Sequence, residues 1–451
     1  MPQINPISQT KTGLLLHPQK TYQEIVAYLN ANWKKSPHAV TEKLDQALGN
    51  LSKKLTSVII AGTSGKSTTI HYLEKISETK SIKIGTFLSP HFISYNERFA
   101  VNNAKITNEI FTDLANQVIN LAGELKLNAS SKDILTAMAL IYFNDQKVDL
   151  AVFEQEDMVE RDPVTICTPF ILGISRIVQN SPESIRQKID NIIDHISTQT
   201  HVISANQSTL FLLKMEQRTI EKNGVWVMPI RKVAPLAYPF EQLFGRSAAL
   251  ADRIIQLYLE KLSVNLASGS TTACIDPKNI KTLHLSSPQF WQSINNEIPN
   301  TFQIINQKEK TILLDNASNL DAFSNLFLGI RLLNYQHSFK NIFFIVGSTK
   351  QQCDEDEFIK LFHSCFKKFS GTLSFYRATN TIAEKTGTPW DLAHLVSLAQ
   401  YNKIKTAQHH NFQSAFQEIS AELEDKHDLL VIAGSQAIIS EYLKLAQGNN
   451  L

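Results

Sequence analysis

The residues of this chain that could bind phosphate stand together at positions 62–68. They read Gly62, Thr63, Ser64, Gly65, Lys66, Ser67 and Thr68. Glycines let backbone N–H groups turn toward an anion, a helix N-terminus adds partial positive charge, and a lysine neutralises the β- and γ-phosphates of a nucleotide. The spacing is shorter than the usual eight-residue P-loop. We predict that these residues bind nucleotide phosphates; the alternative is an ordinary strand–turn–helix junction.

The flanking sequence predicts the elements that hold this turn. The apolar run 58–61 is typical of a buried strand, and apolar residues recur at helical spacing from Ile70 to Ile76. Strands that alternate with helices predict an α/β fold with a doubly wound parallel sheet, whose ligands collect at the carboxyl ends of the strands. Further strands are predicted at 83–87 and 149–153, and helices at 21–31, 40–55, 107–123, 133–144 and 247–262.

Polar residues follow two of these strands. Ser89 lies in an irregular loop after the strand 83–87, where Pro90 disfavours a helix, and Glu154 directly follows the strand 149–153. Because the strands share one carboxyl edge, we expect Ser89, Glu154 and the 62–68 turn to face one crevice. The alternative for Ser89 is an ordinary turn serine beside a proline. The alternative for Glu154 is a solvated acid at the end of a strand.

The rest of the chain predicts a second α/β unit, with strands at 311–314, 342–346 and 429–433. A chain of 451 residues is too long for one ordinary core. Polar stretches at 267–272 and 285–300 are typical of a linker. We therefore predict a P-loop-containing domain over residues 1–290 and a smaller, Rossmann-like α/β domain over residues 291–451.

The composition excludes several classes of protein. The 44 basic and 42 acidic residues give a net charge of +2, and the basic residues are dispersed, which argues against a nucleic-acid partner. Four separated cysteines without a CxxC pair indicate neither a disulfide framework nor a zinc site. The chain shows no signal-peptide pattern and no long apolar run, so we predict no membrane partner and a cytoplasmic location. We also predict a monomer.

Several motifs resemble those of the folylpolyglutamate synthase/dihydrofolate synthase family of the Mur ligase superfamily. Residues 61–66 match the family's AGTNGKG, and residues 86–91 with 95–98 match its TSPH…NER segment. The resemblance continues through residues 135–139, 147–149, 299–304 (PGRFQI), 315–319 (D-(G/V)-A-H-N) and 434–435. It therefore spans nearly the whole chain and implies the Mur ligase architecture.

The resemblance also implies a reaction. The family uses ATP to activate the carboxylate of a pteroate or folate as an acyl phosphate, which the amine of L-glutamate then attacks. By the resemblance, Lys66 would hold the phosphates, Ser89 and Glu154 would bind Mg²⁺, and Asp315 would bind ATP. The alternative for Asp315 is a helix N-cap. The family also has a lysine modified to a carbamate that bridges two metals, for which Lys188 is the nearest candidate; a surface helix lysine is the alternative.

Other positions depart from the family pattern. After Glu154 the family has a glycine-rich loop, whereas residues 155–161 here contain no glycine and three acids, Glu156, Asp157 and Glu160. Without glycine the backbone cannot make the same close approach, and added negative charge near phosphates is unfavourable. By the resemblance, three functional residues of the family are replaced here. Ser181 stands in place of a metal-binding histidine, Thr301 in place of an ATP-binding arginine, and Ser318 in place of a histidine.

Two functions remain open from the sequence. One is an ATP-dependent ligase that adds glutamate to a folate or related carboxylate. The other is a diverged paralogue that binds nucleotide without efficient ligation and acts on another substrate or as a regulatory or partner protein. An unrelated P-loop kinase or ATPase is disfavoured because no phosphate-binding motif of standard length is present.

Overall fold

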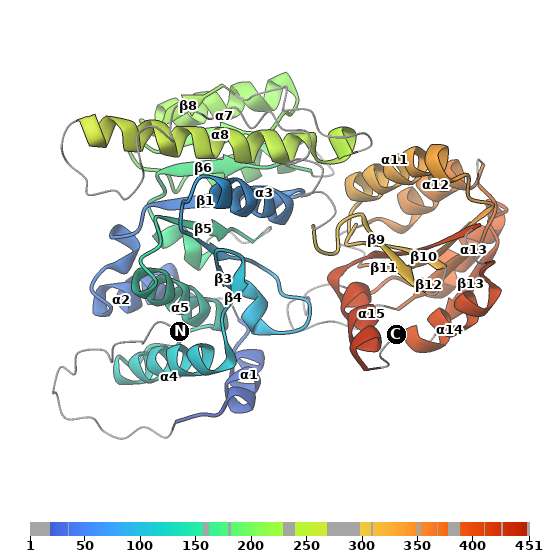
Figure 1. Cartoon of the computed structure of the whole chain (residues 1–451), viewed down its shortest axis with the longest axis horizontal. Coiled ribbons are helices and arrows are strands. Elements are labelled where there is room, and N and C mark those ends of the chain that lie inside the picture. The colour runs from blue at the N-terminus through green and yellow to red at the C-terminus, as the bar shows by residue number, and fades with distance from the viewer. Residues whose placement is uncertain are drawn as a thin grey trace.

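Two α/β units lie side by side in the computed structural model of this chain (Figure 1). The structure describes residues 19–34, 36–156, 162–178, 182–228, 240–267, 298–307, 310–349, 353–367, 369–377, 388–409, 411–424 and 427–448. This arrangement confirms the predicted fold class. The boundary between residues 290 and 291 and most of the predicted linker lie outside the described residues, which include only residue 267 and residues 298–300 of the two linker stretches.

The N-terminal sheet has eight strands in the order β4-β3-β2-β5-β1-β6-β7-β8. The strands from β2 to β8 pair in parallel, as predicted, whereas β3 and β4 add an antiparallel hairpin at one edge. Asn102 and Asn103 form its turn with φ angles of 49° and 64°, which asparagine tolerates better than most residues. The strands are β1 (Ser57–Ala61), β2 (Ile84–Phe87), β3 (Phe99–Val101), β4 (Ala104–Lys105), β5 (Leu150–Glu154), β6 (Ile171–Ile174), β7 (His201–Ser204) and β8 (Val225–Val227).

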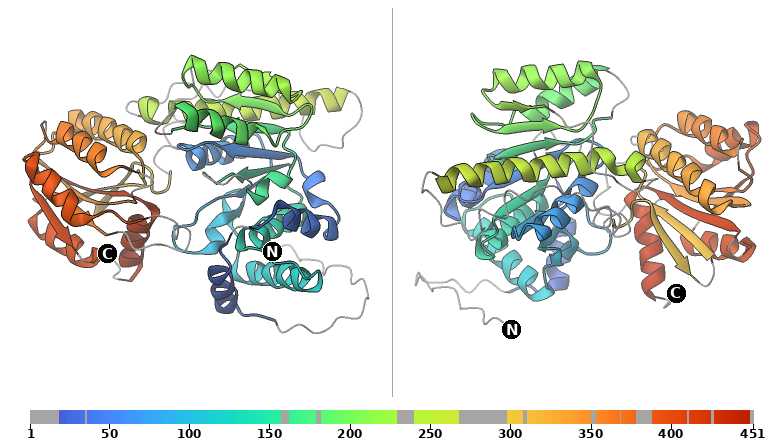
Figure 2. Two further views of the ribbon diagram at one scale, coloured as in Figure 1. Left: turned by 180° about the vertical axis from the view of Figure 1, so that it is seen from behind. Right: turned by 45° about the horizontal axis from the view of Figure 1, so that its top comes forward.

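Helices cover both faces of this sheet, because its central strand β1 has apolar side chains on both faces. Val58 and Ile60 pack in one apolar cluster with α3 and α8, while Ile59 and Ala61 pack in another with α4 and α5 (Figures 1 and 2). This alternation with a period of two is that of a strand buried on both faces. The helices are α1 (Tyr22–Ala31), α2 (His38–Ala47), α3 (Lys66–Thr79), α4 (Asn108–Glu124), α5 (Ser131–Asp145), α6 (Pro182–Ile193), α7 (Thr209–Glu221) and α8 (Phe240–Ala267).

One predicted helix is too long. The helix expected over residues 40–55 ends at Ala47, and a separate short 3₁₀ turn follows at Leu51–Lys53. Gly49 and Asn50 separate the two with φ angles of 84° and 56°, a left-handed conformation that a continuing α-helix does not contain.

The C-terminal sheet has the strand order β13-β12-β11-β14-β10-β9. Its strands are parallel except β9, which pairs antiparallel with β10 at the edge. The elements are β9 (Gln303–Gln307), β10 (Lys310–Asp315), α11 (Leu320–His337), β11 (Asn341–Gly347), α12 (Glu355–Phe366), β12 (Leu373–Tyr376), α13 (Leu392–Tyr401), β13 (Thr406–His409), α14 (Phe412–Glu422), β14 (Asp428–Gly434) and α15 (Gln436–Gly448).

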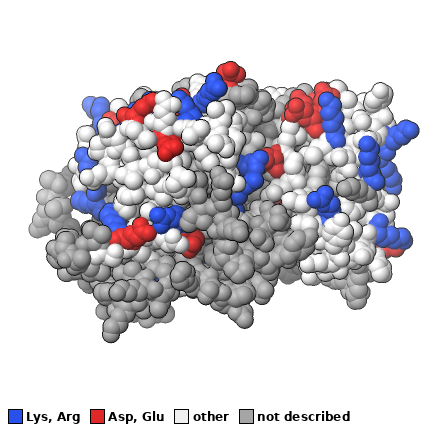
Figure 3. Space-filling model, turned by 90° about the horizontal axis from the view of Figure 1, so that it is seen from above, with Lys and Arg blue, Asp and Glu red and all other residues white. Residues whose placement is uncertain are grey.

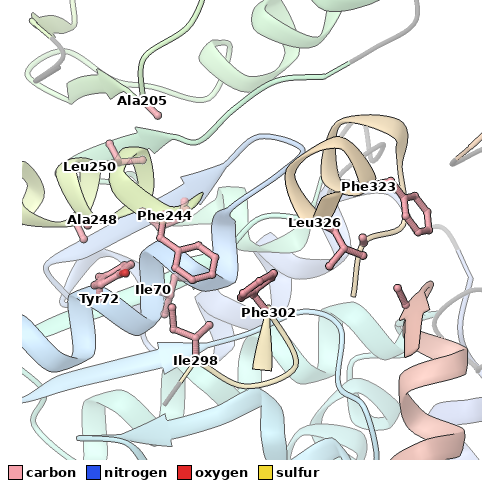
Figure 4. Packing of buried hydrophobic residues seen from close by; sticks show 14 of the residues in the cluster. Ile70, Tyr72, Ala205, Phe244, Ala248, Leu250, Ile298, Phe302, Phe323 and Leu326 are labelled. Carbon is pink, nitrogen blue, oxygen red and sulfur yellow. The ribbon is translucent and has the colours of Figure 1, made fainter. Parts of the chain in front are cut away.

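Apolar side chains connect the two domains. Phe302 lies between Phe244 of α8 and Leu326 of α11, and all three belong to one buried cluster (Figure 4). Two polar contacts add to it: Asn325 Nδ2 donates to the carbonyl oxygen of Leu243 at 3.3 Å, and Ser440 Oγ donates to that of Phe92 at 2.7 Å. The domains therefore share packed contacts as well as a chain connection. Within the described part of the chain, no helix combines the length and apolar character needed to cross a membrane.

Candidate functional site

The 62–68 turn joins β1 to α3 and is held by the end of β6. Gly62 and Gly65 have φ angles of 119° and 87°, which L-residues with side chains rarely adopt. The backbone N–H groups of Thr63 and Ser64 donate to the carbonyl oxygen of Arg176 at 2.9 and 3.0 Å. The turn therefore has the glycine-dependent conformation that the sequence predicts, with its shape fixed by a neighbouring strand.

Replacing Gly62 with alanine is expected to lower the thermal stability and to distort the turn. A Cβ atom at Gly62 would stand 2.3 Å from Ser175 Oγ, and the φ angle is unfavourable for alanine. Strain of this kind costs about 1–3 kcal/mol. Thermal unfolding followed by circular dichroism would measure it. The matched control is Gly123→Ala in α4, where no atom lies within 4 Å of the added Cβ. Equal melting temperatures for Gly62→Ala and Gly123→Ala would contradict the prediction.

Lys66, Ser67 and Glu154 come together where α3 begins. Lys66 Nζ donates to the carbonyl oxygen of Gly62 at 3.0 Å and lies 4.0 Å from Glu154 Oε1. Ser67 Oγ is 3.2 Å from both carboxylate oxygens of Glu154. Burial raises the pKa of Glu154 to about 7, although Lys66 opposes the rise. Glu154 is only 3% exposed, so the interpretation as a solvated strand-end acid is wrong.

Ser89 lies against the same carboxylate. Its backbone N–H is 3.4 Å from Glu154 Oε2, and its hydroxyl donates to Glu156 and accepts from Arg98 Nη1 at 2.9 Å. Arg98 Nε also donates to His91 Nδ1 at 2.9 Å. Burial and the charge of Arg98 lower the pKa of His91 to about 3, so its ring is neutral and can accept that bond. The buried Arg98 thus positions the loop that carries Ser89.

Glu156 is one of the three acids in the loop after Glu154 whose charge is expected to be unfavourable near phosphates. In the structure it forms an ion pair with Lys132 and lies 3.9 Å from Arg98 Nη1. Although burial opposes it, these two cations hold the pKa of Glu156 below its ordinary value. Its negative charge is therefore compensated within the domain, which corrects the expectation for this residue. Residues 157–161, including Asp157 and Glu160, lie outside the described residues.

Lys188 on α6 reaches the same turn. Its Nζ donates to Thr63 Oγ1 at 2.8 Å. Burial, together with the charge of Lys66, lowers the pKa of Lys188 to about 7. Lys188 is partly buried and contacts the turn, so the alternative of a surface helix lysine does not describe it, and the structure places both Lys66 and Lys188 at the 62–68 turn.

Asp315 is the last residue of β10 in the C-terminal domain. Its side chain binds the backbone at Phe302, in the segment that leads into that domain. The N–H of Phe302 donates to Asp315 Oδ2 at 2.8 Å. The interpretation as a helix N-cap is wrong, because Asn319 caps α11 by accepting from the N–H of Ala322 at 3.0 Å. Among the hydrogen bonds and ion pairs of the described residues, none joins Asp315 to the 62–68 turn, although both line the cleft described below.

Asp315→Asn is expected to reduce the pH dependence of stability. Burial raises the pKa of Asp315 from 3.8 to about 7. A carboxyl with a higher pKa in the folded state takes up a proton on folding, so the free energy of unfolding falls as the pH rises from about 4 to about 7. Asparagine keeps an oxygen for the N–H of Phe302 but does not titrate. Melting temperatures between about pH 5 and pH 8 should therefore decline less in the variant. Asp113→Asn, at an exposed site on α4, should retain the wild-type decline; a wild-type decline in Asp315→Asn would contradict the prediction.

Many of these groups line one large cleft of about 3050 Å³ between the domains. Its lining includes residues 63–68, Ser89, Glu154, Glu156 and Asp315. Thr301 and Ser318, two of the departures from the family pattern, also line it, whereas Ser181 lies outside the described residues. The carboxyl ends of β1, β2 and β5 meet there because β5 pairs with both of the others. The sequence expectation that the turn, the Ser89 loop and Glu154 share a crevice is confirmed.

The sequence did not allow several residues of the site to be predicted. They are Lys132, Ser175, Arg176 and Ser247, while Arg98 was quoted only as part of a motif. The last residue of the NER segment was a signal that could have identified Arg98. The other four carry no local pattern, because each reaches the site through strand pairing or helix packing.

The comparisons with known proteins agree with this arrangement. No family model matches the sequence. The chain is 29% identical over 156 residues to the dihydrofolate synthase/folylpolyglutamate synthase of Bacillus subtilis, covering 34% of this chain and 36% of that protein. It is 32% identical over 112 residues to the dihydrofolate synthetase of Saccharomyces cerevisiae, covering 25% and 26%. The matches thus span less than half of the length of these relatives.

The likeness of fold covers nearly the whole chain. The folylpolyglutamate synthase of Mycobacterium tuberculosis complexed with ADP has a TM-score of 0.72 at 16% identity, covering 94% of this chain and 98% of that one. E. coli FolC in complex with DHPP and ADP also has a TM-score of 0.72, at 15% identity, covering 96% and 100%. Taken together, about a third of this chain is similar in sequence to dihydrofolate synthase/folylpolyglutamate synthases, and nearly the whole chain shares the fold of solved folylpolyglutamate synthases.

Proposed function

We propose that this protein is an ATP- and Mg²⁺-dependent ligase that joins L-glutamate to the carboxylate of a pteroate or folate. The carboxylate oxygen attacks the γ-phosphate of ATP and releases ADP, and the amine of glutamate then displaces phosphate from the acyl phosphate. The observation that carries the proposal is the convergence of Lys66, Ser67 and Glu154 within 4.0 Å in the interdomain cleft. Its relatives are named for this activity, and a bifunctional folylpolyglutamate synthase/dihydrofolate synthase of similar fold was solved with Mn, AMPPNP and L-glutamate bound.

The charges of the site suit this chemistry. A triphosphate and a carboxylate repel each other, so cations must neutralise both before they can react. Residues 62–68 would hold the phosphates of ATP, with Lys66 as the main cation. Glycine at positions 62 and 65 lets the backbone lie close to the phosphates.

The oxygen groups near Glu154 fit Mg²⁺. This ion prefers oxygen ligands and is usually held by one or two carboxylates together with phosphates and water. Glu154 and Ser89 would bind it, and the bound ion would supply positive charge to the phosphates. Within the described residues no group of three His, Cys, Asp or Glu side chains could hold a metal alone, so phosphate oxygens would complete the set.

Lys188 and Asp315 have proposed roles as well. The pKa of about 7 leaves part of Lys188 as the neutral amine, the form that can react with CO₂ to give a carbamate and release a proton. Asp315 would contact ATP from the C-terminal domain, which we propose spans residues 291–451 beside an N-terminal domain of residues 1–290. A monomeric state and a cytoplasmic location stay predictions.

The decisive assay combines purified protein with ATP, Mg²⁺, L-glutamate and either dihydropteroate or tetrahydrofolate. ADP release and the mass of the product are followed together. A product heavier by one glutamate residue, formed only with all components, would support the ligase. ATP binding without any turnover would refute it.

One observation favours the alternative, a paralogue that binds nucleotide without efficient ligation. The hydroxyl of Ser89 donates to Glu156, and the Glu156 carboxylate stands where the family has a glycine. This contact competes with the proposed metal role of Ser89. Measurable ATP binding, together with unchanged affinity in Ser89→Ala, would support that alternative.

A further inference from the structure

Two arginines stand beside the phosphate-binding turn where the domains meet. Arg176 follows β6, and its Nη2 lies 2.7 Å from Asp321 Oδ1 in the first turn of α11. Arg246 lies on α8 and also lines the interdomain cleft. Figure 3, a view from above, shows that basic and acidic side chains lie next to one another near the middle of that face.

The chain at or next to each arginine contacts the turn. The carbonyl oxygen of Arg176 accepts the N–H groups of Thr63 and Ser64. Ser247, directly after Arg246, donates from Oγ to the carbonyl oxygen of Gly65 at 3.3 Å. A Cβ atom at Gly65 would approach that same Oγ at 2.8 Å, so α8 packs closely on the turn. Both guanidinium groups therefore extend from positions that are fixed relative to the proposed phosphate site.

The cluster has more positive than negative charge. Although Arg246 is exposed to the cleft, desolvation and the charge of Arg176 lower its pKa, and Asp321 opposes this. Of the two guanidinium groups, Arg176 forms the ion pair with Asp321, while Arg246 is close enough for the charge of that carboxylate to act on it. The side chains of Arg176 and Asp321 are 39% and 23% exposed, and an exposed ion pair contributes at most about fivefold to an equilibrium constant. An anion with several charges can therefore displace Asp321, and arginine binds phosphate oxygens through two parallel hydrogen bonds.

We propose that Arg176 and Arg246 bind the terminal phosphates of the nucleoside triphosphate held in the 62–68 turn, in exchange for the contact between Arg176 and Asp321. This inference rests on the proposed nucleotide binding. It also couples the two domains to the ligand, because Asp321 belongs to the C-terminal domain and loses its partner when the triphosphate binds.

The test is isothermal titration of the full chain with Mg-ATP and with AMP. Arg176→Gln and Arg246→Gln are each expected to weaken Mg-ATP binding by about tenfold or more, as for other charged hydrogen bonds. AMP lacks the terminal phosphates, so its affinity should change by less than about twofold. Asp321→Asn removes the competing carboxylate and should strengthen Mg-ATP binding by up to about fivefold.

Matched variants separate this proposal from the proposed function. Arg253→Gln, on the same helix as Arg246 and paired with Glu260, should bind Mg-ATP as the wild type does. Wild-type binding that Lys66→Ala abolishes and both arginine variants retain would overturn the arginine proposal and leave the nucleotide site standing. Equal losses for Mg-ATP and AMP would overturn it too. A wild type that binds no ATP would overturn both proposals. Melting temperatures establish that each variant is folded.

Discussion

Replacing Lys66 with alanine is expected to weaken Mg-ATP binding and turnover by at least about 100-fold, the usual effect of removing a charged group that contacts the reacting phosphates. Lys66 is only 8% exposed, and its Nζ lies between the Gly62 carbonyl and Glu154. Without it, the phosphates would meet the Glu154 carboxylate with less compensating charge. Isothermal titration with Mg-ATP and an ADP-release assay would measure both effects.

The control for this prediction is Lys53→Ala, an exposed lysine in the 3₁₀ turn before β1. It removes the same charge from the chain, so long-range electrostatics change equally while the site keeps its contacts. We expect wild-type affinity and turnover in this variant. Nucleotide affinity that survives in Lys66→Ala would show that residues 62–68 do not bind phosphate.

Glu154→Gln is expected to lower Mg²⁺-dependent turnover by about 100-fold or more, because an amide oxygen binds a divalent cation far less strongly than a carboxylate does. Binding of ATP without metal should not weaken, since the variant removes a negative charge near the phosphates. The two effects therefore separate in titrations with and without Mg²⁺. A purely structural role of Glu154 would reduce both together.

The titration of Glu154 is expected to make the affinity for Mg²⁺ depend on pH. Because the pKa of Glu154 is about 7, its carboxylate form increases as the pH rises through that value. Apparent Mg²⁺ affinity should therefore rise between about pH 6 and pH 8 in the wild type and stay level in Glu154→Gln. Glu109→Gln, at an exposed position of α4, should behave as the wild type. A parallel pH profile in wild type and Glu154→Gln would contradict the assignment.

Much of the fold could be predicted because its signals are local. The apolar strands β1, β5, β10, β11 and β14 were each placed to within about two residues, the usual uncertainty at element boundaries. The remaining strands were not predicted, because each is only two to five residues long and so few residues carry its pattern; these are β3, β4, β6, β7, β8, β9, β12 and β13. The helix over 40–55 was extended too far, because two left-handed residues end it where hydrophobic periodicity continues.

For the candidate site too, the features with a local sequence signal could be predicted and those made by distant residues could not. The position of the 62–68 turn and of Glu154 at a strand end could be predicted from neighbouring residues. The ion pair that compensates the negative charge of Glu156 could not be predicted, because its partner Lys132 lies 24 positions away on a different element. The conformational role of Asp315 was missed as well, since the N–H it accepts belongs to Phe302, at the entry to the domain.

The sequence by itself determined the strand–turn–helix that carries Lys66, since glycine, lysine and hydroxyl residues act through the local backbone. Only the tertiary structure decided what surrounds that turn. Lys188 meets Thr63 across 125 positions of sequence, and Ser247 meets Gly65 across 182. The physical reason is that hydrogen bonds and charges act over a few ångströms of space, and parallel strand pairing and helix packing bring distant residues within that range.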